Sequence, residues 1–343
     1  MLTTDLLRRH FHCPACRAHP LEVKPFAMDG PGIVHGVISC PKCRNWYRIE
    51  DGLAELLIPA LRHTPALDAF TRRFRDRWEG WEAAADSAGG GSEHKLEQKS
   101  FYDADAVGYE SSMLQLPFWK AVDAASIGSI AGGGTADKIL LEIGCGTGRI
   151  SIPTAGRFAK VLGFDISETM VRTAMKKRAQ TGAAGRDIHY FVADAENIPV
   201  RAETADAALL YGILHHVESP STVLAETARC LRAGGTLFGC ENNRSLFRPI
   251  FDFLMLARKL WNEKAHEEHF IISHRILKEW FAGTGLRSAV WTSVFLPPHL
   301  FNLLSPANAR RLLALSDGLG SALPWLRWQG GLLMFSGRKE QRS

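Results

Sequence analysis

The sequence predicts an α/β domain, with a mostly parallel sheet and helices on both faces, preceded by a small cysteine-rich module. Three observations support this fold class. Strand-like and helix-like segments alternate from residue 137 onward, a glycine-rich turn follows the first strand, and two Cys-x-x-Cys pairs lie near the N-terminus. A Gly/Ser-rich stretch at residues 83–100 is typical of a linker. We therefore expect three regions, at residues 1–60, 61–100 and 101–343.

Composition is that of a folded protein without a strong charge bias. The chain has 343 residues, 46% of them hydrophobic, and a net charge of +5. This charge permits an anionic partner but falls short of the basic asymmetry of nucleic-acid binders. No apolar run reaches the ~20 residues of a membrane span, and the first residues lack the apolar core of a secretory signal. We expect a cytoplasmic protein.

The N-terminal cysteines have the spacing of a metal site. Cys13 and Cys16 form one pair, Cys40 and Cys43 form the second, and 23 residues separate the pairs. In a reducing compartment such pairs are typical of metal ligands rather than disulfides. Four thiolates close a tetrahedral Zn²⁺ site and leave no position for substrate, so we expect a structural zinc.

An amphipathic helix is predicted over residues 67–81. Its apolar side chains recur at steps of three and four, with arginines between them. We expect the aromatic stripe to pack on a neighbouring domain and the arginines to face solvent; a contact with RNA or a partner is the alternative. The stripe consists of Leu67, Phe70, Phe74, Trp78 and Trp81, and the arginines are Arg72, Arg73, Arg75 and Arg77.

The long C-terminal region shows the alternation of strands and helices that is typical of a doubly wound sheet. Strand candidates alternate with helical stretches such as residues 167–182 and 219–235. Two later candidates, at residues 288–295 and 330–337, would close the sheet. The first five strand candidates are residues 138–144, 160–166, 188–194, 206–212 and 235–241.

A glycine-rich turn follows the first strand. Gly144, Gly146 and Gly148 stand between an apolar strand and a helix, where glycine permits a tight turn and the close approach of a ligand. A dinucleotide fingerprint requires a third glycine where Arg149 stands, which disfavours a nicotinamide enzyme.

With Glu142, this loop matches the pattern (D/E)-x-G-x-G-x-G. The segment resembles the class I methyltransferases, in particular those similar to the ubiquinone and menaquinone biosynthesis enzymes, over residues 101–343. The resemblance implies a Rossmann-like seven-stranded methyltransferase sheet and S-adenosyl-L-methionine as cofactor. It also implies that the loop, Cys145 included, cradles the methionine part and that Glu142 orients its amino group.

Further acidic residues stand where the next strands end. Asp165 is placed to accept hydrogen bonds from both ribose hydroxyls. The resemblance assigns Asp194 to a hydrogen bond from the adenine amino group. Taken singly, each acid could equally be a helix cap or a surface carboxylate. The remaining expected cofactor contacts are Ile166, Ala195, Tyr211 and Gly212.

Methyl transfer from a sulfonium is an in-line displacement that requires positioning and, for some acceptors, a base. His215 or His216, after the fourth strand, is the candidate base, because neutral imidazole accepts a proton near neutral pH. The alternative is that these histidines only shape the loop. We expect Asn242 and His269 in the substrate pocket; the His266–His269 segment is one residue too short for the zincin motif.

The N-terminal module also resembles known proteins. Residues 10–60 are similar to small zinc-ribbon proteins that activate partner methyltransferases, and to the zinc module of a bacterial ribosomal-RNA guanine methyltransferase. The second family typically carries histidine where Cys43 stands here. We expect a stabilising or docking module.

Two apolar segments carry scattered arginines, at residues 245–261 and 296–328. They are typical of interfacial or pocket-lining helices. The leading hypothesis is therefore methyl transfer to a small, apolar acceptor such as a lipid-like compound, with peripheral contact to a membrane. The alternatives are an rRNA or tRNA base methyltransferase that docks RNA through the ribbon, and a non-catalytic cofactor-binding scaffold. The sequence does not predict an oligomeric state.

Overall fold

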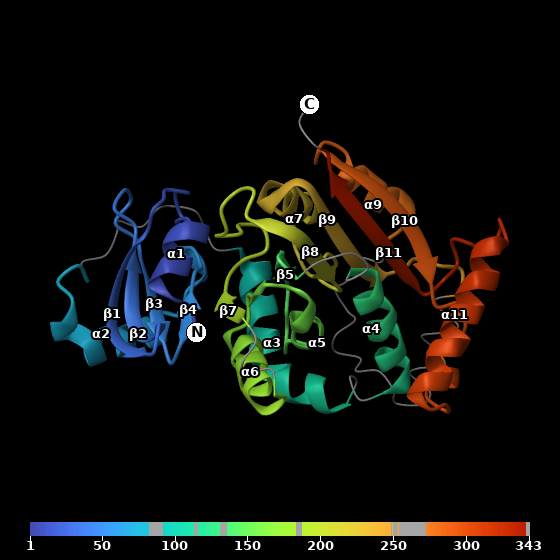
Figure 1. The fold of residues 1–343 in the computed structure, drawn as a ribbon, viewed down its shortest axis with the longest axis horizontal. Coiled ribbons are helices and arrows are strands. Elements are labelled where there is room, and N and C mark those ends of the chain that lie inside the picture. Colours follow the sequence, from blue (N-terminus) through green and yellow to red (C-terminus); the bar gives the residue numbers. More distant parts are fainter. Residues whose placement is uncertain are drawn as a thin grey trace.

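The computed structural model describes residues 1–81, 92–112, 116–130, 136–182, 187–247, 249, 253 and 272–340. An N-terminal module and a larger α/β part lie side by side (Figure 1). The predicted pocket residue His269 and most of residues 245–261 lie outside the described residues.

The N-terminal module is an antiparallel sheet with one helix on each side. Strands β1 to β4 pair in chain order. Helix α2 ends at Phe74, earlier than predicted, but its stripe packs as expected: Phe70 is buried against Trp46 and Val37. The elements are α1 (Thr4–His10), β1 (Glu22–Asp29), β2 (Gly32–Ser39), β3 (Trp46–Glu50), β4 (Leu53–Glu55), η1 (Pro59–Leu61), α2 (Thr64–Phe74) and η2 (Arg75–Arg77).

The α/β part contains all seven predicted strands. Helices begin where the sequence supplies caps: the Ser167 hydroxyl accepts from the Met170 amide, and the Ser219 hydroxyl from the Thr222 amide. The strands are β5 (Ile139–Ile143), β6 (Lys160–Asp165), β7 (Ile188–Val192), β8 (Ala205–Tyr211), β9 (Leu231–Asn242), β10 (Leu286–Ser293) and β11 (Leu332–Lys339). The helices are α3 (Glu93–Ser112), α4 (Pro117–Ile130), α5 (Ser151–Thr154), η3 (Ala155–Arg157), α6 (Glu168–Gln180), α7 (Pro220–Cys230), α9 (His274–Phe281), α10 (Pro298–Phe301) and α11 (Pro306–Ala322).

The two parts share one sheet, which corrects the expectation of a separate seven-stranded sheet. Among the described residues the sheet has eleven strands, in the order β1-β2-β3-β4-β7-β6-β5-β8-β9-β11-β10. Strand β4 pairs in parallel with β7, with Ala54 opposite Phe191 and Glu55 opposite Val192. Pairing through backbone groups leaves little trace in side-chain pattern, so the sequence did not indicate it.

Helices cover both faces of this sheet, as predicted for a doubly wound fold (Figure 1). Successive residues of a strand point to opposite faces. Leu141 of β5 accordingly joins a core shared with α1, α7 and α9, whereas Leu140 joins a core shared with α4, α6 and α11. The first core is continuous with the N-terminal module, where the rings of Phe11 and Phe191 lie 5.0 Å apart.

Helix α3 corrects part of the predicted linker. It begins at Glu93, inside the stretch 83–100, and the Gly/Ser-rich half of that stretch lies mostly outside the described residues. Within the described part of the chain, no helix combines the length and apolar character needed to cross a membrane.

Candidate functional site

The glycine-rich turn after β5 is shaped by packing on two sides and is open on a third. Gly144, Gly146 and Gly148 all have positive φ, at 71°, 49° and 75°. A Cβ on Gly144 would lie 2.5 Å from Cδ1 of Ile213, and one on Gly148 would lie 2.7 Å from the hydroxyl of Tyr190. Around Gly146, by contrast, such a Cβ would meet no neighbouring atom of the described chain within 4 Å. A ligand can therefore approach the backbone at Gly146.

Glu142 is a buried carboxyl just before this turn. It is 2% exposed, and its Oε2 atom has no hydrogen-bond partner among the described residues. Burial raises the pKa of Glu142 to about 8, although hydrogen bonds from Ser151 oppose the shift. A buried carboxyl oxygen without a partner is costly, so this atom is suited to receive a cationic donor from a ligand.

Asp165, at the end of β6, is tied to the glycine turn. Its Oδ2 accepts from the Gly146 amide and its Oδ1 from the Ser167 amide, each across 3.0 Å. Burial raises the pKa of Asp165, and the two amides act in the opposite direction. The carboxylate is therefore held in one orientation beside the open side of the turn.

The carboxylate of Asp194, after β7, already pairs with a residue that the sequence did not single out. The ammonium group of Lys95, in α3, lies 2.8 Å from Oδ2 of Asp194 and 3.0 Å from Oε2 of Glu196. The Glu196 amide donates to Oδ1 of Asp194 across 2.9 Å. Any adenine group at Asp194 would therefore share this carboxylate with Lys95.

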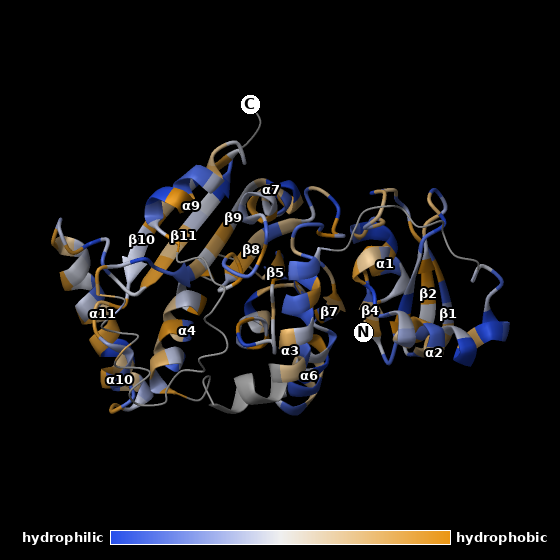
Figure 2. Ribbon diagram, turned by 180° about the vertical axis from the view of Figure 1, so that it is seen from behind, coloured by the Kyte–Doolittle hydropathy of each residue, from blue (hydrophilic) through white to orange (hydrophobic). Residues whose placement is uncertain are grey.

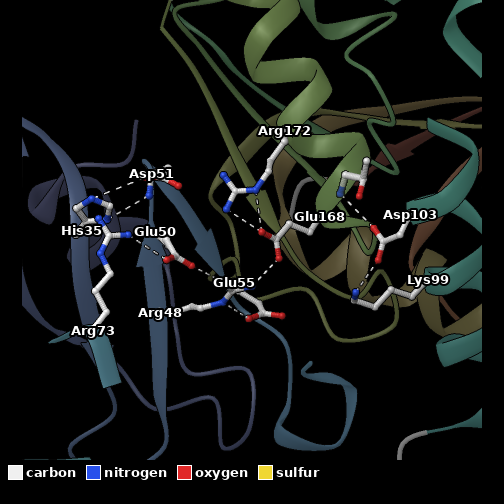
Figure 3. A network of polar contacts seen from close by, with 11 residues as sticks. His35, Arg48, Glu50, Asp51, Glu55, Arg73, Lys99, Asp103, Glu168 and Arg172 are labelled. Atoms are coloured by element: carbon white, nitrogen blue, oxygen red, sulfur yellow. Dashed lines mark hydrogen bonds and ion pairs between the residues drawn. The ribbon is translucent and has the colours of Figure 1, made fainter. Parts of the chain in front are cut away.

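The same helix reaches the loop after Asp165. Asp103 accepts from the Ser167 hydroxyl, from the Thr169 amide and from Lys99; Figure 3 shows Asp103 together with Lys99. The helical spacing of Lys95, Lys99 and Asp103, four residues apart, was the available signal for a helix here. The adjoining Gly/Ser run concealed it.

His215 lies after β8 and is oriented by a buried carboxylate from β9. Its Nδ1 lies 2.6 Å from Oε2 of Glu241, whose Oε1 accepts from the Leu214 amide, also across 2.6 Å. Glu241 is 1% exposed. Both oxygens of Glu241 are thus engaged, and Glu241 fixes the orientation of the imidazole through Nδ1.

His216 belongs to a different set of contacts. Its Nε2 lies 2.8 Å from the hydroxyl of Tyr102, and its carbonyl lies 3.0 Å from Nε2 of His94. Both partners are in α3. The two candidate bases therefore have separate surroundings, although their rings are only 3.9 Å apart.

A guanidinium closes the side of the turn next to α4. Arg149 makes two hydrogen bonds to Asp123, of 2.7 and 2.5 Å, and its guanidinium lies 4.6 Å from the ring centre of Trp119 and 5.2 Å from that of Tyr211. The Tyr211 hydroxyl also donates to Asp123. Asp123 and Trp119 come from α4, which the sequence analysis did not predict.

At the end of β9, neighbouring asparagines differ in role. The Asn243 amide group donates to the carbonyls of Trp328 and Gly330, which anchors the segment before β11. The predicted substrate residue Asn242 is half-buried at the strand end. Since β5 to β9 run parallel where they pair, their carboxyl ends bring together the predicted residues of all five strands.

The four cysteines of the N-terminal module form one cluster. All four Sγ atoms lie within 4.8 Å of one another, and the closest pairs, Cys13 with Cys43 and Cys16 with Cys40, are 3.5 Å apart. Zinc–thiolate bonds of ~2.3 Å in a tetrahedron place the sulfurs at about this separation. The Tyr47 hydroxyl lies 3.1 Å from the Cys13 sulfur. The thiols fit a closed structural zinc site.

Comparisons with known proteins agree with this geometry. Residues 141–239 match the methyltransferase domain family, and residues 12–52 match the Trm112p-like protein family. The chain carries a class I methyltransferase domain behind a Trm112-like zinc ribbon. In this class the cofactor is S-adenosylmethionine, and the open side of Gly146 and the unpartnered oxygen of Glu142 fit its amino acid part.

Curated relatives match only part of the chain. The ubiquinone biosynthesis O-methyltransferase of Parvibaculum lavamentivorans is 31% identical over 164 residues, which are 47% of this chain and 64% of the relative. That of Rhizobium etli is 28% identical over 161 residues, which are 46% of this chain and 64% of the relative. The match thus spans less than two thirds of each relative.

A solved structure shares the fold. Phosphoethanolamine N-methyltransferase 2 of Haemonchus contortus, in complex with S-adenosyl-L-methionine, superposes with a TM-score of 0.51 at 18% identity. The superposition covers 74% of this chain and 61% of that one. It supports the fold of the methyltransferase domain.

Proposed function

We propose that the chain transfers a methyl group from S-adenosylmethionine to a hydroxyl of a small apolar acceptor. The observation that carries this proposal is the pairing of His215 with buried Glu241 at the same sheet edge as the glycine turn. When bound, the cofactor supplies an electrophilic methyl group on a sulfonium. The protein then has to hold the acceptor in line and remove its proton.

The cofactor residues have separate tasks in this proposal. Glu142 orients the amino group of the methionine part, Asp165 binds the ribose hydroxyls, and Asp194 faces the adenine amino group. Cys145, Ile166, Ala195, Tyr211 and Gly212 complete the lining. Because Asp165 already accepts two backbone amides, its free lone pairs are presented in a fixed direction and cost little entropy to use.

His215 is the proposed base. Glu241 holds its Nδ1, so Nε2 accepts the proton of the acceptor hydroxyl, and the buried carboxylate stabilises the imidazolium that results. His216 instead contacts Tyr102 of α3, so we assign it to positioning α3 over the site. Asn242 and His269 remain candidate acceptor contacts.

The hydroxyl acceptor is supported by the names of the two relatives, which are O-methyltransferases. Those names favour neither RNA methylation nor a cofactor-binding scaffold. An apolar acceptor is supported by the exposed apolar side chains beside the sheet edge, where Leu246 is 81% exposed and its amide is bonded to the side chain of Gln329.

The test uses isotopically labelled cofactor with cell extract, fractionated into lipids, small polar molecules and RNA. Label is expected in an apolar fraction, and label confined to RNA would contradict the proposal. His215→Ala should lower kcat by about 10²- to 10⁴-fold while the cofactor Kd stays unchanged. His63→Ala, an exposed histidine on the N-terminal side of α2, is the control. Turnover of His215→Ala equal to wild type would remove the base assignment.

A further inference from the structure

Helix α11 and the segment after it leave large apolar side chains in solvent. Leu315 is 66% exposed, Leu319 71%, Leu323 42% and Trp325 70%. Leu315 and Leu319 are four residues apart on α11 and therefore share one stripe, and Leu323 follows directly after the helix. A different stripe of the helix, which includes Leu313, is buried, and α11 packs on α4. We call the exposed residues Leu315, Leu319, Leu323 and Trp325 the α11 surface.

Cationic side chains flank the α11 surface. Arg310 and Arg311 are exposed in the first half of the helix, and Arg327 is exposed beyond Trp325. The single acid between residues 298 and 328, Asp317, turns toward β10: its carboxylate accepts from the Ser293 hydroxyl and the Val294 amide. Figure 2 shows hydrophobic and hydrophilic stretches alternating along α11.

More cations lie where the chain leaves this surface. The ring of Trp328 is stacked on His274, at the start of α9, and has the ammonium group of Lys278 5.6 Å from its centre. Arg275 is exposed on the same helix, together with one exposed acid, Glu279. Among the described residues of α9 and of 298–328, the exposed cations thus outnumber the exposed acids.

We propose that the α11 surface docks on an anionic phospholipid membrane. Leucines and a tryptophan that flank a helix end are suited to the interface between headgroups and acyl chains, and arginines beside them bind lipid phosphates. A second copy of this chain fits less well. In a two-fold interface the surface would face itself, and Arg310 and Arg311 would meet a like-charged stretch. Within residues 298–328 the one acid is Asp317, which is bonded to Ser293 and Val294.

The position of α11 gives this docking a consequence for the site. Helix α4 lies between α11 and the glycine turn and holds Arg149 through Asp123 (Figure 1). The docked membrane would therefore lie one helix away from the cofactor residues. The inference concerns binding alone and does not depend on the proposed methyl transfer.

The experiment is co-sedimentation of the full chain with vesicles. We compare vesicles of phosphatidylcholine with vesicles of equal parts phosphatidylcholine and phosphatidylglycerol, and expect the chain to pellet with the second. R310Q/R311Q should weaken this partitioning about 25-fold, from ~1 kcal/mol or about fivefold per arginine. L315N/L319N should weaken it at least about tenfold, through loss of apolar burial.

R72Q/R75Q is the matched control. It removes the same charge from exposed positions at and just beyond the end of α2, in the N-terminal module, and should leave partitioning unchanged. The proposal is overturned if wild type does not pellet with anionic vesicles, or if the control weakens binding as much as R310Q/R311Q. It is also overturned if light scattering shows a dimer that L315N/L319N converts to monomer while vesicle binding stays absent.

Discussion

Arg48 of the zinc ribbon donates a hydrogen bond from Nη2 to Oε2 of Glu168 across 2.5 Å (Figure 3). Glu168 is the first residue of α6, three positions after Asp165. Arg48 also contacts Glu55 and Glu50, each across 2.7 Å, and its side chain is only 4% exposed. The zinc ribbon and the loop that holds the proposed ribose ligand are therefore joined by one buried ion network.

Arg48→Met should strongly destabilise the chain. Glu50, Glu55 and Glu168 would lose their shared cation, and leaving the buried Glu55 uncompensated costs about 3–5 kcal/mol. The free energy of unfolding in urea measures this loss. Arg73→Gln is the control, because Arg73 is 55% exposed and lies 3.6 Å from Glu50, so its loss should cost below about 1 kcal/mol. Equal effects of the two substitutions would contradict the network.

Asp165→Ala should weaken cofactor binding. Charge-assisted hydrogen bonds to both ribose hydroxyls are worth about 2–4 kcal/mol in total, and the substitution also releases the Gly146 amide. Calorimetric titration with S-adenosylmethionine measures the affinity. Asp5→Ala, an exposed acid in α1, serves as the control. Unchanged affinity of Asp165→Ala, or tight NAD binding by wild type, would refute the assignment.

Removal of zinc should destabilise the whole chain. Because β4 pairs with β7 and the two parts share a core, unfolding of the ribbon exposes an edge of the methyltransferase sheet. Elemental analysis should give one zinc per chain, held at ~2.3 Å from each sulfur, and chelation should lower the Tm of a single transition. Cys230→Ser, outside the cluster, should retain the metal. A metal-free chain with unchanged Tm would contradict a structural zinc.

Stability should depend on pH through Glu142. Burial raises its pKa to about 8 from an ordinary value of 4.5, so between these two pH values the folded chain holds a proton that the unfolded chain has lost. This contribution is full below pH 4.5 and is lost as pH rises through 8. At ~1.4 kcal/mol per unit, the free energy of unfolding should fall by about 2–3 kcal/mol between about pH 6 and about pH 9.

Glu142→Gln is the matched comparison for this effect, because the amide has nearly the same shape and does not titrate. Urea unfolding of the variant and of wild type, both without cofactor, should give curves of stability against pH that diverge between about pH 5 and about pH 8 and run parallel above about pH 9. Parallel curves over the whole range would show that Glu142 is already ionised in the folded chain.

Local patterns predicted most of the strands and the metal ligands. Each of the seven strands after residue 137 is an apolar run between turn signals, and burial of such runs depends on few distant contacts. The cysteines are similar: the spacing within each Cys-x-x-Cys pair predicts one turn, and the cluster of four Sγ atoms follows. Asp165 and Asp194 could be proposed from the sequence because they stand at strand ends, which apolar runs mark.

Contacts between distant segments were not predictable in this way. Lys95 reaches Asp194 across 99 positions and Arg48 reaches Glu168 across 120, and neither side chain belongs to a motif. The pairing of His215 with Glu241 likewise needs two adjacent parallel strands to end at the same height. Such pairs form only when the sheet order is established.

By itself, therefore, the sequence determined the elements, the glycine turn and the four thiol ligands, because each is set by interactions among neighbouring residues. Only the tertiary structure decided that β4 adds to β7, that α3 contacts the proposed cofactor residue Asp194, and which of the two histidines is oriented by a carboxylate. The physical reason is that backbone pairing and buried ion pairs are satisfied by partners from anywhere in the chain, and only the packed fold selects the partner.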